Sequence, residues 1–156
     1  MAVLLAILAI SPAAWTEDEG HRHELTEQQI GSVKFATSCA TTVSADFNHA
    51  VALLHSFQYE QAREMFASVA RKDPACAMAQ WGVAMSQYHG LWDSGDLSAG
   101  RAAITQAQAL AAENPDTTPR ERGYILALAQ VYRQDRDKAG NAQAFEQAMG
   151  SLQASY

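Results

Sequence analysis

Histidine and cysteine are the side chains of this sequence whose types most directly suggest chemistry. His21-x-His23 could capture zinc, copper or nickel, since imidazole suits these ions. Two histidines on a polar segment make a weak site, however, and a solvated segment is the simpler interpretation. His49 and His55 are six positions apart, so on one helix they face different sides and form no metal-binding pair. We therefore predict neither a metal nor a cofactor.

The run His89-Gly90-Leu91-Trp92 stands at the predicted end of a helix. A histidine at a helix C-terminus interacts well with the helix dipole, which is its structural interpretation. A ligand contact from His89 and Trp92 is the functional alternative.

Sequence signatures of common enzymes are absent. The chain has no Gly-x-Ser-x-Gly, phosphate-loop, His-Glu-x-x-His or dinucleotide-binding pattern. Asp46, Glu60, Glu64 and Asp73 have the spacing of helix-surface or capping carboxylates. No set of nucleophile, base and orienting group emerges, so we expect a binding protein and not an enzyme.

The N-terminus resembles an export signal. Residues 3–10 form an apolar run too short to span a bilayer, and residues 11–14 are small residues of the kind that precede a cleavage site. We predict a signal peptide over residues 1–14 and a periplasmic or secreted protein. No basic residue precedes the run, so a buried N-terminal helix is the alternative. No other segment reaches transmembrane length, so we expect no transmembrane segment in the mature chain.

Composition restricts the classes of protein to which this chain can belong. A chain of 156 residues with 48% hydrophobic and 18% charged residues can bury the core of one domain. The net charge is −6 and no basic stripe is present, so nucleic acid is not an expected partner.

Apolar periodicity predicts an all-α protein. Residues 15–43 form a polar leader, in which Val33 and Phe35 alternate with Lys34 and predict a short extended piece. Residues 44–156 carry six amphipathic stripes at helical spacing, which predict three antiparallel hairpins. The first stripe contains Phe47, Ala50, Val51, Leu54 and Phe57; the third runs from Ala77 to Tyr88; the sixth contains Phe145, Met149 and Leu152.

Helix boundaries are marked by capping residues. Ser44 and Asp96 are predicted N-caps. Asp73-Pro74 should end the second helix, with Asp73 capping the third and Pro74 at its first position. Thr118-Pro119-x-Glu121 predicts a capping box.

The first hairpin resembles a tetratricopeptide repeat. Ala62, Phe66 and Pro74 occur at the offsets of that repeat, and Trp81-Gly82 begins the second hairpin in the same manner. The strings at residues 31–39, 50–57 and 73–82 together resemble a group of exported bacterial tetratricopeptide proteins. This resemblance implies a stacked-hairpin solenoid and an envelope location, and it implies no chemistry.

In such a solenoid the first helix of each hairpin lines the concave face, which is where ligands bind. By this analogy we expect the ligand-binding residues to be Asn48, His55, Gln80, Gln87 and Tyr88, together with His89 and Trp92. The predicted function is therefore a protein- or peptide-binding scaffold of the bacterial envelope. The alternative is a metal-handling or enzyme-associated periplasmic protein that uses its histidines and cysteines.

The two cysteines are expected to pair. Cys39 lies just before the first helix and Cys76 in the first turn of the third, and in a stacked-hairpin array these two helices run parallel as neighbours, which places both residues at one edge. In an exported protein they would form one disulfide, and in a reducing compartment they would be two buried thiols. The sixth helix ends without a polar closing face, so we also expect it to be part of a longer array or to pack on a partner, including a second copy.

Overall fold

The computed structural model describes residues 27–90 and 95–156, and this part of the chain is all-helical. The prediction of the fold class is confirmed. Two short elements come first, α1 (Glu27–Ile30) and the 3-10 helix η1 (Thr41–Val43). The main helices are α2 (Ser44–His55), α3 (Tyr59–Lys72), α4 (Ala77–Met85), α5 (Leu97–Glu113), α6 (Pro119–Ala129) and α7 (Lys138–Ser155).

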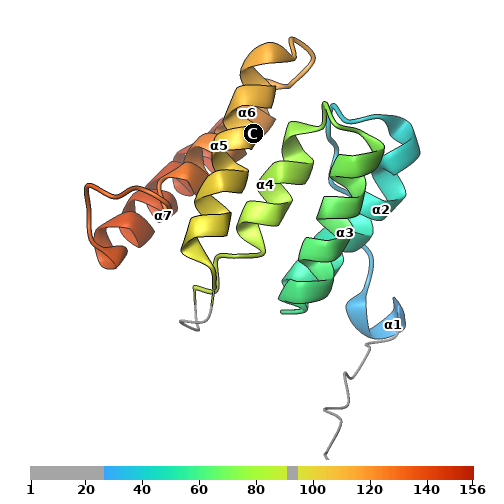
Figure 1. The fold of residues 1–156 in the computed structure, drawn as a ribbon, viewed down its shortest axis with the longest axis horizontal. Helices are drawn as coiled ribbons and strands as arrows, with labels where there is room; N and C mark the ends of the chain where they lie inside the picture. Colours follow the sequence, from blue (N-terminus) through green and yellow to red (C-terminus); the bar gives the residue numbers. More distant parts are fainter. Residues whose placement is uncertain (1–26, 91–94) are drawn as a thin grey trace, which may run out of the picture.

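The six main helices form three hairpins, α2–α3, α4–α5 and α6–α7, which lie side by side (Figure 1). Each helix packs against the next one in sequence, and α4 also contacts α2 and α6. The first helices of the three hairpins are therefore neighbours, as expected. Buried side chains from α2 to α6 join in a single hydrophobic cluster, because none of these helices could bury its apolar stripe alone.

Three of the predicted helix starts can be compared directly with the structure. The Asp96 carboxylate accepts hydrogen bonds from the backbone N–H groups of Ser98 and Ala99, and Thr118 and Glu121 form a complete capping box. The prediction for Ser44 is wrong, since η1 leads directly into α2 and Ser44 is already its first helical residue.

The prediction for Asp73 and Pro74 as the start of the third helix is also wrong. α4 begins at Ala77, and its N-cap is Cys76, whose Sγ accepts a hydrogen bond from the N–H of Ala79. Asp73 instead ends α3, and its carboxylate binds two backbone N–H groups outside the helix. The Asp73 carboxylate is engaged by these N–H groups and does not cap α4.

Phe57 does not belong to the apolar stripe of the first helix. It lies beyond the end of α2, in the left-handed region at φ 60°, and is 57% exposed. The N–H of Phe57 binds the carbonyl of Leu54 and that of Gln58 binds the carbonyl of Leu53, which is the double hydrogen bond of a Schellman turn. The turn into α3 thus outweighs the periodicity at this position.

Two glycines allow the hairpins to approach closely. A Cβ at Gly82 would lie 2.3 Å from the Phe66 ring, and one at Gly100 would lie 2.4 Å from the Tyr132 ring. The Tyr132 hydroxyl donates a 2.6 Å hydrogen bond to the carbonyl of Ala84, so it ties the end of α6 to α4. Burial raises the pKa of this phenol well above its usual value.

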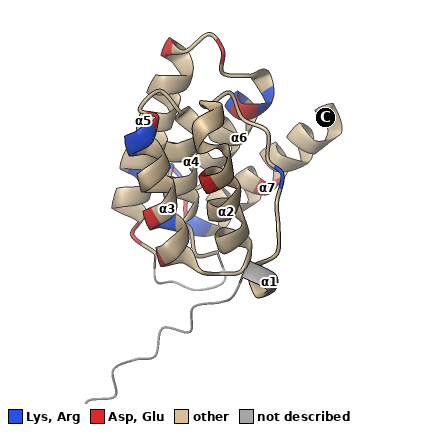
Figure 2. Ribbon diagram, turned by 90° about the vertical axis from the view of Figure 1, so that its right-hand side faces the viewer, with Lys and Arg blue, Asp and Glu red and all other residues tan. Residues whose placement is uncertain are grey.

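No described helix combines the length and the hydropathy needed to cross a membrane. Acidic and basic residues alternate over the side of the molecule seen in Figure 2 and form no basic face there. The predicted signal peptide, His21, His23 and Trp92 lie outside the described residues.

Candidate functional site

A stretched-out segment covers the first helices of the hairpins. We call residues 32–39 the strap; it leaves α1, rises alongside α2 (Figure 2) and contacts α2, α4 and α6 before it reaches η1. Val33, Phe35 and Thr37 are partly buried, whereas Ser32, Lys34 and Ala36 are exposed. This alternation is that of an extended chain with one face on a surface, and it agrees with the short extended piece predicted at Val33–Phe35.

Phe35 is the central anchor of the strap. Its ring centroid lies 5.8 Å from that of Phe47 on α2, 6.1 Å from that of Trp81 on α4 and 5.2 Å from that of Tyr124 on α6. The Arg120 guanidinium lies 5.0 Å from the same centroid. One side chain therefore contacts all three first helices, through aromatic pairs and a cation–π contact.

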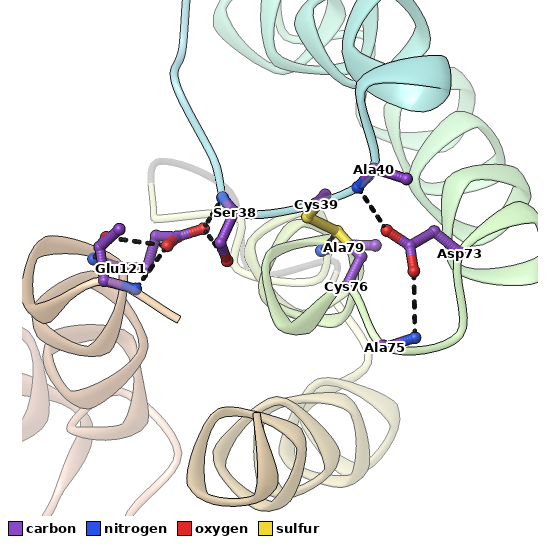
Figure 3. Close-up of a disulfide and its surroundings, with 9 residues drawn as sticks. Ser38, Cys39, Ala40, Asp73, Ala75, Cys76, Ala79 and Glu121 are labelled. Carbon is purple, nitrogen blue, oxygen red and sulfur yellow. Dashed lines mark hydrogen bonds between the residues drawn. A yellow bond between two sulfur atoms is a disulfide. The ribbon is translucent and has the colours of Figure 1, made fainter. Parts of the chain in front are cut away.

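Two polar side chains hold the strap backbone. The N–H of Phe35 donates to Oδ1 of Asn48 at 2.9 Å. The N–H and the hydroxyl of Ser38 both donate to Oε1 of Glu121, at 2.7 and 3.0 Å (Figure 3). Asn48 was predicted as a ligand-binding residue from fold analogy, and it does bind extended backbone, although that backbone belongs to the chain itself.

Glu121 is held in place by its role in the capping box. Oε2 accepts hydrogen bonds from the N–H and the hydroxyl of Thr118, each at 2.8 Å, and the side chain is 2% exposed. The capping box uses only one carboxylate oxygen, and the other is aimed at Ser38. We call the surface of α2, α4 and α6 that the strap covers the groove. The capping motif thus presents a buried hydrogen-bond acceptor to this groove, and the sequence pattern of the capping box alone did not indicate that role.

Cys39 and Cys76 form a disulfide at the end of the strap, with Cα atoms 4.8 Å apart, so the predicted pairing is confirmed. Next to it, the Asp73 carboxylate accepts hydrogen bonds from the N–H groups of Ala40 and Ala75 (Figure 3). The strap is therefore anchored covalently to the start of α4, and Ala40, the residue that follows it, is joined to the end of α3 by a hydrogen bond.

The same three side chains are also the group of potential metal donors that the described residues provide. One donor atom each from Cys39, Asp73 and Cys76 lies within 4.8 Å of the other two. Both sulfur atoms are bonded to each other, and thiolates are what a metal would require. As oxidised in the structure, this cluster is a cross-link.

An open hollow with a volume of about 1280 Å³ lies between α6 and α7. Arg120 and Tyr124 line its α6 side, and both also contact Phe35 of the strap. The hollow therefore adjoins the surface that the strap covers, and the two share these side chains. The α7 side combines apolar groups with amides and one carboxylate: Gln143, Phe145, Glu146, Gln147, Met149, Gly150, Leu152, Gln153 and Tyr156.

Three predicted ligand-binding residues share a smaller cavity of about 210 Å³ near the start of α7: Gln87, Tyr88 and His89. Each of them has a structural partner. Gln87 accepts a hydrogen bond from the N–H of Asp96, Tyr88 packs edge-on against Phe145, and His89 stacks on Tyr59 with centroids 4.2 Å apart. α4 ends at Met85, earlier than predicted, so these residues follow the helix.

His55 and Gln80 are not part of the strap contacts described above. His55 is the exposed last residue of α2, and Gln80 is half-buried on α4.

The groove residues that sequence reasoning missed are Phe35, Arg120, Glu121 and Tyr124. The alternation at Val33–Phe35 was the one local signal for them, because a half-buried aromatic residue within a polar leader needs a surface to pack on.

Comparison with known proteins adds no relative: no family model, curated protein or solved structure matches this chain. The assignment of function therefore depends on the site itself.

Proposed function

We propose that this protein is a helical scaffold that binds a peptide segment of another protein, with the hollow between α6 and α7 as its open binding surface. The observation that carries this proposal is that the hollow adjoins the surface on which the strap, an extended segment, already lies. Arg120 and Tyr124 belong to both, so the chemistry that holds Phe35 is also presented to an external segment.

The composition of the hollow supports a peptide over a small molecule. Its volume of about 1280 Å³ exceeds the roughly 300–1,000 Å³ of most small-molecule pockets. Phe145, Met149 and Leu152 are only partly buried on α7, so apolar area remains for a partner to cover. Glutamine amides beside them can donate and accept, which suits the alternating donors and acceptors of a peptide backbone.

The proposal is tested by selecting peptides from a displayed random library on the oxidised full-length protein. We expect selected peptides to bind with saturation, and Met149→Glu to weaken them about tenfold or more, because it places a charge in the apolar part of the hollow. Gln106→Glu, an exposed change on α5, is the matched control and should leave affinity unchanged. Equal binding to the two variants would contradict the proposal.

A second copy of the chain is the competing occupant of the hollow, in keeping with the expected self-association through the last helix. Sedimentation of the protein across a hundredfold concentration range separates the two cases. A monomer whose hollow binds selected peptides supports the proposal, whereas a dimer abolished by Met149→Glu assigns the hollow to self-association.

We also propose that the scaffold works in the bacterial envelope. The disulfide agrees with an oxidising compartment. A signal peptide over residues 1–14 would be removed on export. Sequencing the N-terminus of protein secreted by a bacterial host should therefore find Trp15 first, and a mature chain that keeps Met1 would contradict this location.

A further inference from the structure

The strap contacts its groove in the manner of a bound peptide. Phe35 fills an aromatic site built by α2, α4 and α6, Asn48 binds the strap backbone once, and Glu121 binds the N–H and hydroxyl of Ser38. Recognition thus uses one apolar anchor, together with side chains that hold the backbone and one hydroxyl. None of these contacts depends on the chain connection between the strap and α2.

Glu121 makes this groove selective. Its Oε1 lies in a side chain that is 2% exposed, and among the described hydrogen bonds only Ser38 donates to it. A buried charged acceptor without donors is costly, so a segment that replaced the strap would have to supply them. A backbone N–H with a serine or threonine hydroxyl on the same residue supplies both.

The spacing of the two contacts sets a register. Phe35 and Ser38 are three positions apart, and the residues between them are Ala36, which is exposed, and Thr37, which is half-buried. An extended chain rises by about 3.3 Å per residue, so the three residues from Phe35 to Ser38 span at most about 10 Å, and the bend of the chain at Ser38 lets its hydroxyl reach the carboxylate. Only a segment with the aromatic residue three positions before the hydroxyl residue meets both sites.

We propose that the groove of α2, α4 and α6 is a peptide-recognition site for extended segments with the pattern aromatic-x-x-Ser/Thr, and that the strap is its built-in occupant, retained by the Cys39–Cys76 disulfide. This inference rests on the proposed function and deepens it, because it assigns a sequence-selective site beside the hollow that shares Arg120 and Tyr124 with it. A segment bound in the hollow would reach Arg120 and Tyr124, and would compete with Phe35 for them.

The disulfide supplies a direct assay for this site. In the variant Cys39→Ser, Cys76 is a free thiol at the end of the groove. The probe is a nonapeptide with the sequence of residues 31–39, whose cysteine is activated as a mixed disulfide with thionitrobenzoate. The Cys76 thiolate attacks the peptide sulfur, a protein–peptide disulfide forms, and thionitrobenzoate leaves as a coloured thiolate. A peptide that docks in register should react faster than one that does not.

The decisive comparison uses the full-length double variant Phe35→Ala/Cys39→Ser, in which the built-in occupant has lost its anchor. We expect the nonapeptide to label Cys76 at least tenfold faster than the same peptide with alanine in place of phenylalanine, or with alanine in place of the serine before its cysteine. The single variant Cys39→Ser should react more slowly with the nonapeptide, because its intact strap competes.

Equal labelling rates for the three peptides would overturn the inference. If circular dichroism shows that the double variant has lost its helices, the same comparison of peptides on Cys39→Ser decides the question. The result is also distinct from the test of the hollow. Selective labelling with no library binding refutes only the proposed function, and library binding with unselective labelling refutes only the peptide site under the strap.

Discussion

At the scale of single residues, two buried polar side chains link parts of the chain that are distant in sequence. Glu121 joins α6 to the strap, and Tyr132 joins the end of α6 to α4. Both are buried and hydrogen-bonded, which is the condition under which a polar group can be tolerated inside a protein. The two side chains differ in their surroundings. Glu121 presents a hydrogen-bond acceptor to the groove, whereas the Tyr132 hydroxyl is enclosed in the core.

Tyr132 should make stability depend on pH in the alkaline range. Burial raises its folded-state pKa above the value of about 10 of an exposed tyrosine, so its contribution is complete below pH 10 and is lost as pH rises toward the folded-state pKa. Tyr132→Phe should cost about 1 kcal/mol near pH 8, through the lost hydrogen bond. Above pH 10 the advantage of the wild type should shrink by up to about 1.4 kcal/mol per pH unit.

Urea unfolding between pH 8 and pH 11 measures this change. Tyr156→Phe is the control, because Tyr156 is 69% exposed and should not alter the profile. A difference between wild type and Tyr132→Phe that stays constant over this range would show that Tyr132 titrates normally in the folded protein.

At the scale of elements, the turn from α5 to α6 is held by one arginine. The Arg122 guanidinium donates to the carbonyls of Ala111, Asn114 and Thr117, which surround the C-terminal end of α5. The last carbonyls of a helix have no partners within the helix, so an arginine at this point satisfies them and also complements the helix dipole. Asn114 ends the helix here, as the sequence predicted.

Arg122→Ala should lower the free energy of unfolding by about 2–3 kcal/mol, because it removes charge-assisted hydrogen bonds to several carbonyls. Arg122→Lys should recover less than half of this loss, since a single ammonium group lacks the planar fork that reaches separate acceptors. Denaturant unfolding of both variants tests this. Arg63→Ala, which removes an exposed charge from the middle of α3, should change stability by less than about 0.5 kcal/mol, and a loss as large as that of Arg122→Ala would contradict the assignment.

At the scale of the whole molecule, the disulfide determines how firmly the strap is held. It joins residues 37 positions apart and closes a loop around the first hairpin. In the chain-entropy model a loop of this length adds about 4 kcal/mol to stability, which is a large share for a small domain.

Reduction should therefore lower the free energy of unfolding of the wild type by about 4 kcal/mol. The urea midpoint of unfolding should fall accordingly. Cys39→Ser should show the same loss without a reductant and no further change when dithiothreitol is added. Intact mass after alkylation of denatured, unreduced protein provides the independent check. Two alkylated thiols in exported protein, or a wild type indifferent to dithiothreitol, would contradict this role.

The helices could largely be predicted from the sequence because their signals are local. Apolar residues at helical spacing identified α2 to α7, and the capping residues Asp96 and Thr118 each contact N–H groups within three positions. Local reasoning failed at Phe57, where the Schellman turn outweighed periodicity, and at Asp73, whose carboxylate binds Ala40 and Ala75 while Cys76 caps α4.

The sequence by itself determined an all-helical chain of three hairpins, because short-range periodicity records each helix. The pairing of the cysteines was a prediction from the parallel order of stacked first helices, and the structure confirms it. Only the tertiary structure decided what covers those first helices. Ser38 and Glu121 are 83 positions apart, and Phe35 meets Phe47, Trp81 and Tyr124 from three different helices. Such contacts depend on how the helices are packed side by side, and no local pattern records the partner of a residue so distant in the chain.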